Sequence, residues 1–209
     1  GRSQLCVVLY DKSSGYGTQI ITRQRIGTVT LGNTVFNSSK TSYNNAISTL
    51  NSAAASYLNT SLASSARCVG TNPSRPTSDS PGYYTNSATF MKGHSGTLKK
   101  SDTNYTTDHN KMSSLGILYC DGGGSNAAYW LASRTISSTS STCSFEIRSV
   151  WAYGLPLSSQ QIVLINDTTT SNTVGYSKTC GLRPVFTLKP TVKVTGGKGS
   201  SSNPYTLGT

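Results

Sequence analysis

The side chains that perform acid, base or nucleophilic catalysis are few in this sequence. His94 and His109 are its two histidines, and its seven Asp and Glu residues are spread along 209 positions. A serine nucleophile needs a positioned base, and the Gly-x-Ser-x-Gly motif of one large hydrolase class is absent. Asp102 and Asp108 are the closest acid pair in sequence, and we expect Asp108 to stabilise the N-terminus of a short helix. The sequence therefore predicts a protein without enzyme activity.

Cysteine supplies the other reactive groups, and the five cysteines form no Cys-x-x-Cys or Cys-x-x-His motif. A zinc site is therefore not expected, and Asn166 with Asp167 offers too few oxygen ligands for calcium. We expect neither a metal nor another cofactor. The favoured interpretation is that most cysteines are small buried apolar groups. Two disulfides are the alternative, with Cys143 and Cys180 as the favoured pair.

Hydroxyl side chains dominate the composition, with 35 serines and 29 threonines, whereas 12% of residues are charged. Average proteins have about a quarter of their residues charged, so a typical cytosolic enzyme is not indicated. The net charge of +11 raises nucleic acid as a partner, but the cations are scattered and lack interleaved aromatic residues. We expect no nucleic-acid partner. The net positive charge still predicts a weak attraction of the protein to anionic cell surfaces or glycans. The longest apolar stretches are far too short to span a bilayer, and no basic segment followed by an apolar leader precedes them, so we expect no membrane insertion of this segment.

Helical periodicity appears twice. From Ser38 to Ser64, apolar residues recur every three or four positions, which predicts one long amphipathic helix. A second, short helix is expected over 107–115, with Met112 and Leu115 facing inward and Gly116 as its stop.

Runs rich in β-branched and aromatic residues predict the strands. They cover residues 5–10, 19–21, 28–31, 117–120, 128–133, 144–153, 161–165, 181–188 and 192–194. Together with two helices, these strands indicate an α+β fold with an antiparallel sheet and long loops. We expect a single domain over 1–209, ending in a C-terminal β tail over 190–209.

Aromatic residues give the best hint of ligand binding. Trp151 and Tyr153 end an alternating strand beside Gly154, where a large ring can be presented to a ligand at low entropic cost. Packing of Trp151 in the core is the alternative. Trp130 is expected in the core, and Arg183 is expected to bond loop carbonyls beneath the binding face.

Three sequence motifs carry a resemblance that extends upstream through Ala66-Arg-Cys-Val-Gly70 and Asp102-Thr-Asn-Tyr-Thr106, so it covers most of the chain. They are Tyr129-Trp-Leu-Ala-Ser-Arg134, Gly181-Leu-Arg-Pro-Val-Phe-Thr-Leu-Lys189, and Val194-Thr-Gly-Gly-Lys-Gly followed by Asn203-Pro-Tyr-Thr. With them the chain resembles an uncharacterised group of bacterial surface proteins from gut-dwelling Firmicutes. It is also similar to the C-type-lectin-like fold of formylglycine-generating enzymes and of the variable proteins of diversity-generating retroelements. The resemblance implies this fold and an extracellular or cell-surface location.

The variable proteins keep a fixed scaffold and change side chains on one exposed face near the C-terminus. The resemblance therefore implies an adhesin or receptor-binding module whose binding segment, diversified or fixed, is 135–179. Its partner would be a host or bacterial surface protein or a glycan. The candidate ligand-binding residues are Thr135, Ser137, Ser138, Thr139, Ser141, Arg148, Trp151, Tyr153, Asn166, Asn172 and Tyr176. The candidate scaffold residues are Trp130, Arg134, Gly181 and Arg183.

Two other functions stay open. One is a structural subunit of a pilus-like or filamentous surface assembly, in which the chain would self-assemble. The other follows from the formylglycine-generating enzymes, whose thiols near the C-terminus carry out an oxidation. Cys143 and Cys180 would be the candidate thiols here.

Overall fold

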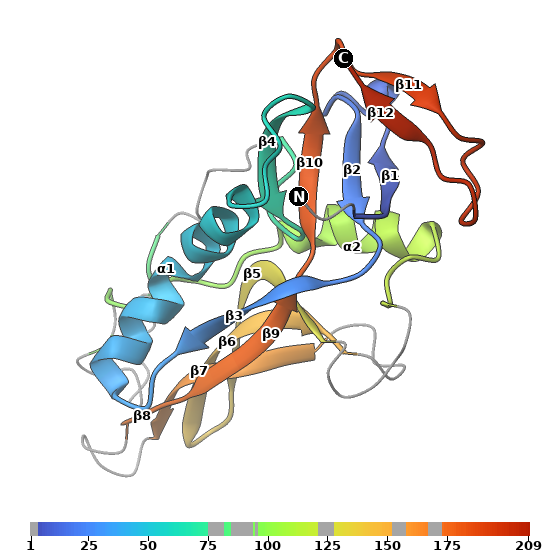
Figure 1. The fold of residues 1–209 in the computed structure, drawn as a ribbon. Helices are drawn as coiled ribbons and strands as arrows, with labels where there is room; N and C mark the ends of the chain where they lie inside the picture. Colours follow the sequence, from blue (N-terminus) through green and yellow to red (C-terminus); the bar gives the residue numbers. More distant parts are fainter. Residues whose placement is uncertain are drawn as a thin grey trace.

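Runs of β-branched residues from both ends of the chain pair to form a four-stranded antiparallel sheet. The structure is a computed structural model that describes residues 4–74, 82–84, 94, 96–120, 128–151, 158–166 and 173–209. The strand order is β1 (Cys6–Tyr10), β2 (Gln19–Thr22), β10 (Pro184–Leu188) and β4 (Ala63–Cys68). Val185 pairs with Ile21 on one side and Arg67 on the other, so a C-terminal strand is central in this sheet (Figure 1).

A second sheet has six strands and curls strongly. Its order is β3 (Ile26–Gly32), β9 (Ser177–Leu182), β5 (Tyr129–Ser138), β6 (Thr142–Val150), β7 (Ser158–Asn166) and β8 (Thr173–Gly175). Neighbours are antiparallel except β5 and β9, which are parallel where Tyr129 pairs with Gly181. β8 leads into β9 through Tyr176, whose backbone N–H donates to the Ile162 carbonyl of β7 at 2.9 Å. The chain therefore pairs first with β7, as the edge strand β8, and directly afterwards lies between β3 and β5, as β9.

The long helix α1 (Phe36–Ala55) packs on the six-stranded sheet through the predicted apolar stripe. Tyr43, Ile47 and Leu50 are fully or almost fully buried there. The predicted helix is confirmed, but its predicted end at Ser64 is wrong. The chain turns after Ala55, and residues 63–68 form β4, which pairs with β10. β4 pairs with a strand more than 100 residues away, and this pairing overrides the local helical spacing of apolar residues. The local spacing contains no information about such a distant partner.

The short helix α2 (Tyr105–Ser114) begins two residues earlier than predicted and buries Met112 as expected. The expectation that Leu115 faces inward is wrong, because it is largely exposed. Gly116 follows the helix with φ of 66°, a left-handed conformation that ends helices and favours glycine. The strand expected over 117–120 is also wrong, since the Ile117 and Leu118 carbonyls accept side-chain hydrogen bonds from Arg183.

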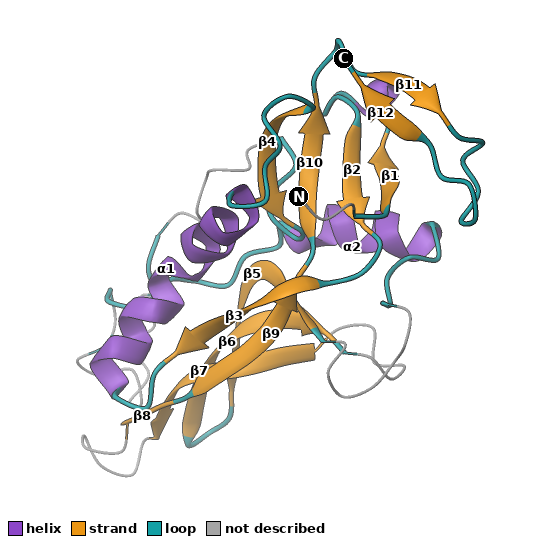
Figure 2. Ribbon diagram, viewed as in Figure 1, coloured by secondary structure: helices purple, strands orange, loops and turns teal. Residues whose placement is uncertain are grey.

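The remaining elements complete an α+β fold, as the sequence predicts (Figure 2). A short 3-10 helix, η1 (Lys12–Ser14), connects β1 and β2. The run expected over 181–188 is two strands, because the chain leaves one sheet and enters the other at Arg183. The C-terminal tail forms an antiparallel ribbon of β11 (Lys193–Gly196) and β12 (Thr206–Gly208). β12 lies within the expected β tail, whereas β4 and β8 were not expected.

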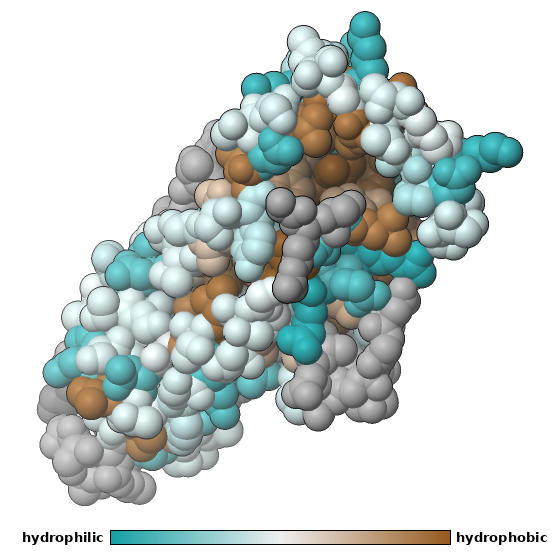
Figure 3. All heavy atoms as spheres, in the orientation of Figure 1, coloured by the Kyte–Doolittle hydropathy of each residue, from teal (hydrophilic) through white to brown (hydrophobic). Residues whose placement is uncertain are grey.

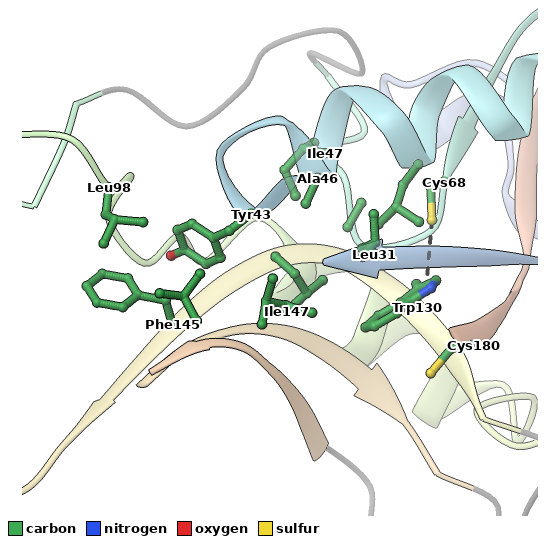
Figure 4. Packing of buried hydrophobic residues seen from close by; sticks show 14 of the residues in the cluster. Leu31, Tyr43, Ala46, Ile47, Cys68, Leu98, Trp130, Phe145, Ile147 and Cys180 are labelled. Atoms are coloured by element: carbon green, nitrogen blue, oxygen red, sulfur yellow. Dashed lines mark hydrogen bonds between the residues drawn. The ribbon is translucent and has the colours of Figure 1, made fainter. Parts of the chain in front are cut away.

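Two hydrophobic clusters hold these layers together. One lies between α1 and the inner face of the six-stranded sheet, where Tyr43 points at Phe145 beside Ile147 (Figure 4). Trp130 belongs to this cluster, as predicted, and its indole N–H donates to the Val29 carbonyl at 2.8 Å. The other cluster joins Met112 of α2 to the four-stranded sheet and to one end of β5 and β6.

Candidate functional site

The strands β5, β6 and β7 present a polar surface on the side opposite α1. Phe145 and Ile147 of β6 point into the core, so Ser144, Glu146 and Arg148 must point to the other side. The register extends this surface to the neighbouring strands. We call it the outer face, and it comprises Thr135, Ser137, Ser144, Glu146, Gln161, Leu164 and Asn166.

Hydrogen bonds between strands order the side chains of the outer face. The Gln161 amide donates to the Ser144 hydroxyl at 2.7 Å, and the Ser159 hydroxyl donates to the Glu146 carboxylate. Ser137 is exposed, whereas Thr135, Glu146, Gln161 and Asn166 are half-buried and Ser144 is buried. Hydroxyl and amide groups held on a sheet at these positions can donate and accept hydrogen bonds with little further ordering on binding.

The hairpin between β5 and β6 extends the outer face, and Thr139 gives it a defined turn. The Thr139 backbone N–H donates to the Thr142 carbonyl at 2.9 Å, and its hydroxyl accepts from the Thr142 N–H at 3.1 Å. Its hydroxyl also accepts from the Ser141 backbone N–H. Thr139 thus orders the turn, and the exposed Ser138 and Ser141 extend from it. The structure thus brings together six of the predicted ligand-binding residues. They are Thr135, Ser137, Ser138, Thr139, Ser141 and Asn166.

Arg148, a candidate ligand-binding residue, contacts the protein itself at the α2 end of β6. Its guanidinium donates to the Asp102 carbonyl and the Ser133 hydroxyl, both at 2.7 Å. It also lies over the Tyr105 ring, 4.3 Å from the centroid. Burial lowers the pKa of Arg148. These contacts fix the end of the outer face rather than leaving the guanidinium in solvent.

The other candidate residues lie apart from the hairpin turn. Trp151 follows the last residue of β6 and is 38% exposed, at the end opposite the turn. Trp151 lies nine positions along the chain from Thr142, about 30 Å at 3.3 Å per residue. Tyr176 lies where β8 continues into β9, with Lys178 Nζ 5.7 Å from its ring centroid. Tyr153 and Asn172 are outside the described residues.

The candidate scaffold residues are buried and connect the sheets. Arg134 donates to the Asn44 carbonyl of α1 at 2.7 Å and lies 3.6 Å from the Asp102 carboxylate. Gly181 allows close packing, because a Cβ there would lie 2.6 Å from Arg25 Cδ. Arg183 bonds the loop carbonyl of Ile117, and it also bonds the carbonyl of Thr22 at the end of β2.

Sequence reasoning missed a buried ion pair beneath the four-stranded sheet. Asp108 lies in the first turn of the short helix α2, as expected, but it is also fully buried and pairs with Arg67 at 2.5 Å. It also accepts from the Gly70 N–H at 2.7 Å and the Tyr10 hydroxyl at 2.9 Å. Burial, followed by the charge of Asp108, raises the pKa of Tyr10. Glu146 was not among the predicted ligand-binding residues, although it lies on the outer face. Its position between the apolar residues Phe145 and Ile147 was the signal that could have placed it there.

All five cysteines are free thiols, and four of them are buried, as the favoured interpretation predicted. The alternative disulfide between Cys143 and Cys180 is absent. Burial raises the pKa of Cys6, Cys143 and Cys180 to about 11 in each case.

These pKa values predict slow alkylation. A pKa of about 11 leaves a thiolate fraction roughly 100-fold below that of an ordinary thiol at pH 8. We expect iodoacetamide to modify the native protein at least about 100-fold more slowly than the unfolded chain, with a rate that rises with pH. Mass spectrometry after alkylation in denaturant should find five modified thiols. Fewer than five would indicate a disulfide, and fast native labelling of Cys143 or Cys180 would contradict the raised pKa.

Comparison with known proteins adds no relative: neither a family model, nor a curated sequence, nor a solved structure matches the chain. Within the described segments, no three His, Cys, Asp or Glu side chains cluster as metal ligands would. Neither helix of those segments is apolar and long enough to cross a bilayer.

Proposed function

We propose that the protein is a ligand-binding module, secreted or displayed on a bacterial surface, that acts through non-covalent contacts on its outer face. The observation that carries the proposal is the ordered polar surface of β5, β6 and β7, in which Gln161, Ser144 and Glu146 already form hydrogen bonds. Such a surface recognises a partner through adaptable hydrogen bonds on a rigid support. Its partner is a surface protein or a glycan.

We also propose that the protein has a C-type-lectin-like fold. Two features support it: two sheets with two helices, and the positions of the resembling motifs. Tyr129-Trp-Leu-Ala-Ser-Arg134 forms most of the buried part of β5, and Gly181-Leu-Arg-Pro crosses between the sheets. The residues of these two motifs are buried, which supports a scaffold role, and the segment between them carries the outer face.

The placement of the outer face is compatible with diversification by a retroelement. Side chains of Ser137, Ser138 and Ser141 are exposed, so their replacement leaves both hydrophobic clusters untouched. A reverse transcriptase gene and a near copy of the 135–179 coding segment beside this gene would support diversification. Without them, the outer face is a fixed binding surface.

The proposal is tested with arrays of glycans and surface proteins, followed by affinity measurement on any ligand found. The variant Thr135→Val, Ser137→Ala, Asn166→Ala removes polar groups while preserving the strand shapes. We expect it to weaken binding by at least about 10-fold, since three lost hydrogen bonds exceed 1.4 kcal/mol together.

A matched control removes the same kind of group elsewhere. Ser38, Ser48 and Ser52 are exposed on the solvent side of α1, and their joint replacement by alanine should leave affinity unchanged. Circular dichroism of both variants checks that the fold is intact. Unchanged binding by the outer-face variant, or equal loss in the control, would show that the ligand binds elsewhere.

A further inference from the structure

The face of the four-stranded sheet that points away from α2 carries a continuous apolar row. Val8 pairs with Ile20, Ile20 with Phe186, and Phe186 with Ala66. Directly paired residues lie on the same side of a sheet, so these four side chains cross all four strands in one line. We call them the apolar row.

The opposite side of the same sheet is already filled. Val7, Ile21 and Val185 alternate with the row and pack with Met112 of α2 in the second hydrophobic cluster. The row residues belong to neither hydrophobic cluster of the described chain, and Val8 is 51% exposed. Figure 3 shows hydrophobic side chains gathered in a hollow over this sheet, beside the β11–β12 ribbon. Exposed apolar surface rimmed by polar groups is typical of an interaction site.

The charges around the apolar row are almost all positive. Segments 4–23, 63–68 and 183–209, which form this sheet, its loops and the ribbon, contain Asp11 as their single acid. Arg67 and Arg183 are buried among protein acceptors. The cations outside the interior are Lys12, Arg23, Lys189, Lys193 and Lys198. A partner that buries the row therefore meets a cationic rim, which favours acidic groups at its own edges.

We propose that the apolar row is a docking site for an amphipathic helix of another protein, whose apolar stripe is flanked by Asp or Glu. Three interstrand spacings of about 4.8 Å make the row roughly 14 Å wide, which fits one helix of about 10 Å diameter. A helix bound to the apolar row would cover this face of the sheet in the same way that α2 covers the opposite face. A second copy of this chain is disfavoured as occupant, because each copy carries a net charge of +11. The apolar row and the outer face belong to different sheets. The partner helix can therefore bind the apolar row while a ligand binds the outer face.

The proposal is tested with a displayed library of helical peptides that share a fixed leucine stripe and vary between Glu and Lys at the flanking positions. We expect selection on the full chain to enrich Glu. Selected peptides, measured by fluorescence anisotropy, should bind Val8→Glu at least about 10-fold more weakly than the parent chain, because a carboxylate then lies in the apolar contact.

Val35→Glu is the matched control, because Val35 is 60% exposed and lies beside α1, away from the row. It should bind the selected peptides like the parent chain, and Val8→Glu should keep its affinity for any outer-face ligand. No enrichment of Glu, or peptides that bind Val8→Glu unchanged, would overturn the proposal. Self-association of the parent chain that Val8→Glu abolishes would also overturn it, because the occupant would then be a second copy.

Discussion

Replacing Asp108 with asparagine is expected to lower the free energy of unfolding by about 3 to 5 kcal/mol, the cost of leaving one partner of a buried ion pair without its opposite charge. The carboxylate accepts from Arg67, Gly70 and Tyr10, and asparagine cannot neutralise Arg67. Chemical denaturation of both proteins, followed by circular dichroism, measures the difference.

Asp11→Asn is the control for this prediction. Asp11 is exposed and caps η1, a position that asparagine also occupies well, so its replacement should change stability by less than about 1 kcal/mol. The double variant Arg67→Met, Asp108→Leu should recover part of the loss, since the unpaired buried charge is gone. A loss below about 1 kcal/mol for Asp108→Asn would mean that water reaches the pair.

Replacing Arg183 with methionine is expected to destabilise the protein by about 3 kcal/mol or more, because buried carbonyls that it bonds lose their donors. Its guanidinium donates to the Thr22 carbonyl at 2.9 Å and to the Ile117 carbonyl at 2.7 Å. It also lies 5.0 Å from the Tyr129 ring centroid. Arg183 thus joins β2, the segment after α2, and β5, and the same denaturation measurement tests its role.

Two further variants separate hydrogen bonding from charge. Arg183→Lys retains the charge, but one ammonium group cannot reproduce the planar set of donors, so it should rescue stability only in part. Lys193→Met removes an exposed cation from the ribbon and should change stability by less than about 0.5 kcal/mol. Full rescue by lysine would show that the charge of Arg183, and not its geometry, stabilises the fold.

Local patterns in the sequence were sufficient to predict most elements of the structure. The three- and four-residue spacing of Tyr43, Ile47 and Leu50 predicts α1, because a helix brings such residues to one face. The alternation around Phe145 and Ile147 predicts β6 for the same kind of reason. The exposure of Ser137, Ser138 and Ser141 near the β5–β6 turn agrees with what the resemblance, rather than a local pattern, implied.

The sequence by itself determined the helical stripe of α1 and the alternation of β6, because these patterns depend on neighbours a few positions away. Tertiary structure alone decided that 63–68 leaves the helix to pair with β10, that Asp108 is buried against Arg67, and that Arg148 contacts Asp102 and Tyr105. It also decided that Val8, Ile20 and Phe186 align into one apolar row. Each of these depends on contacts between segments distant in sequence, whose register and burial no local pattern records.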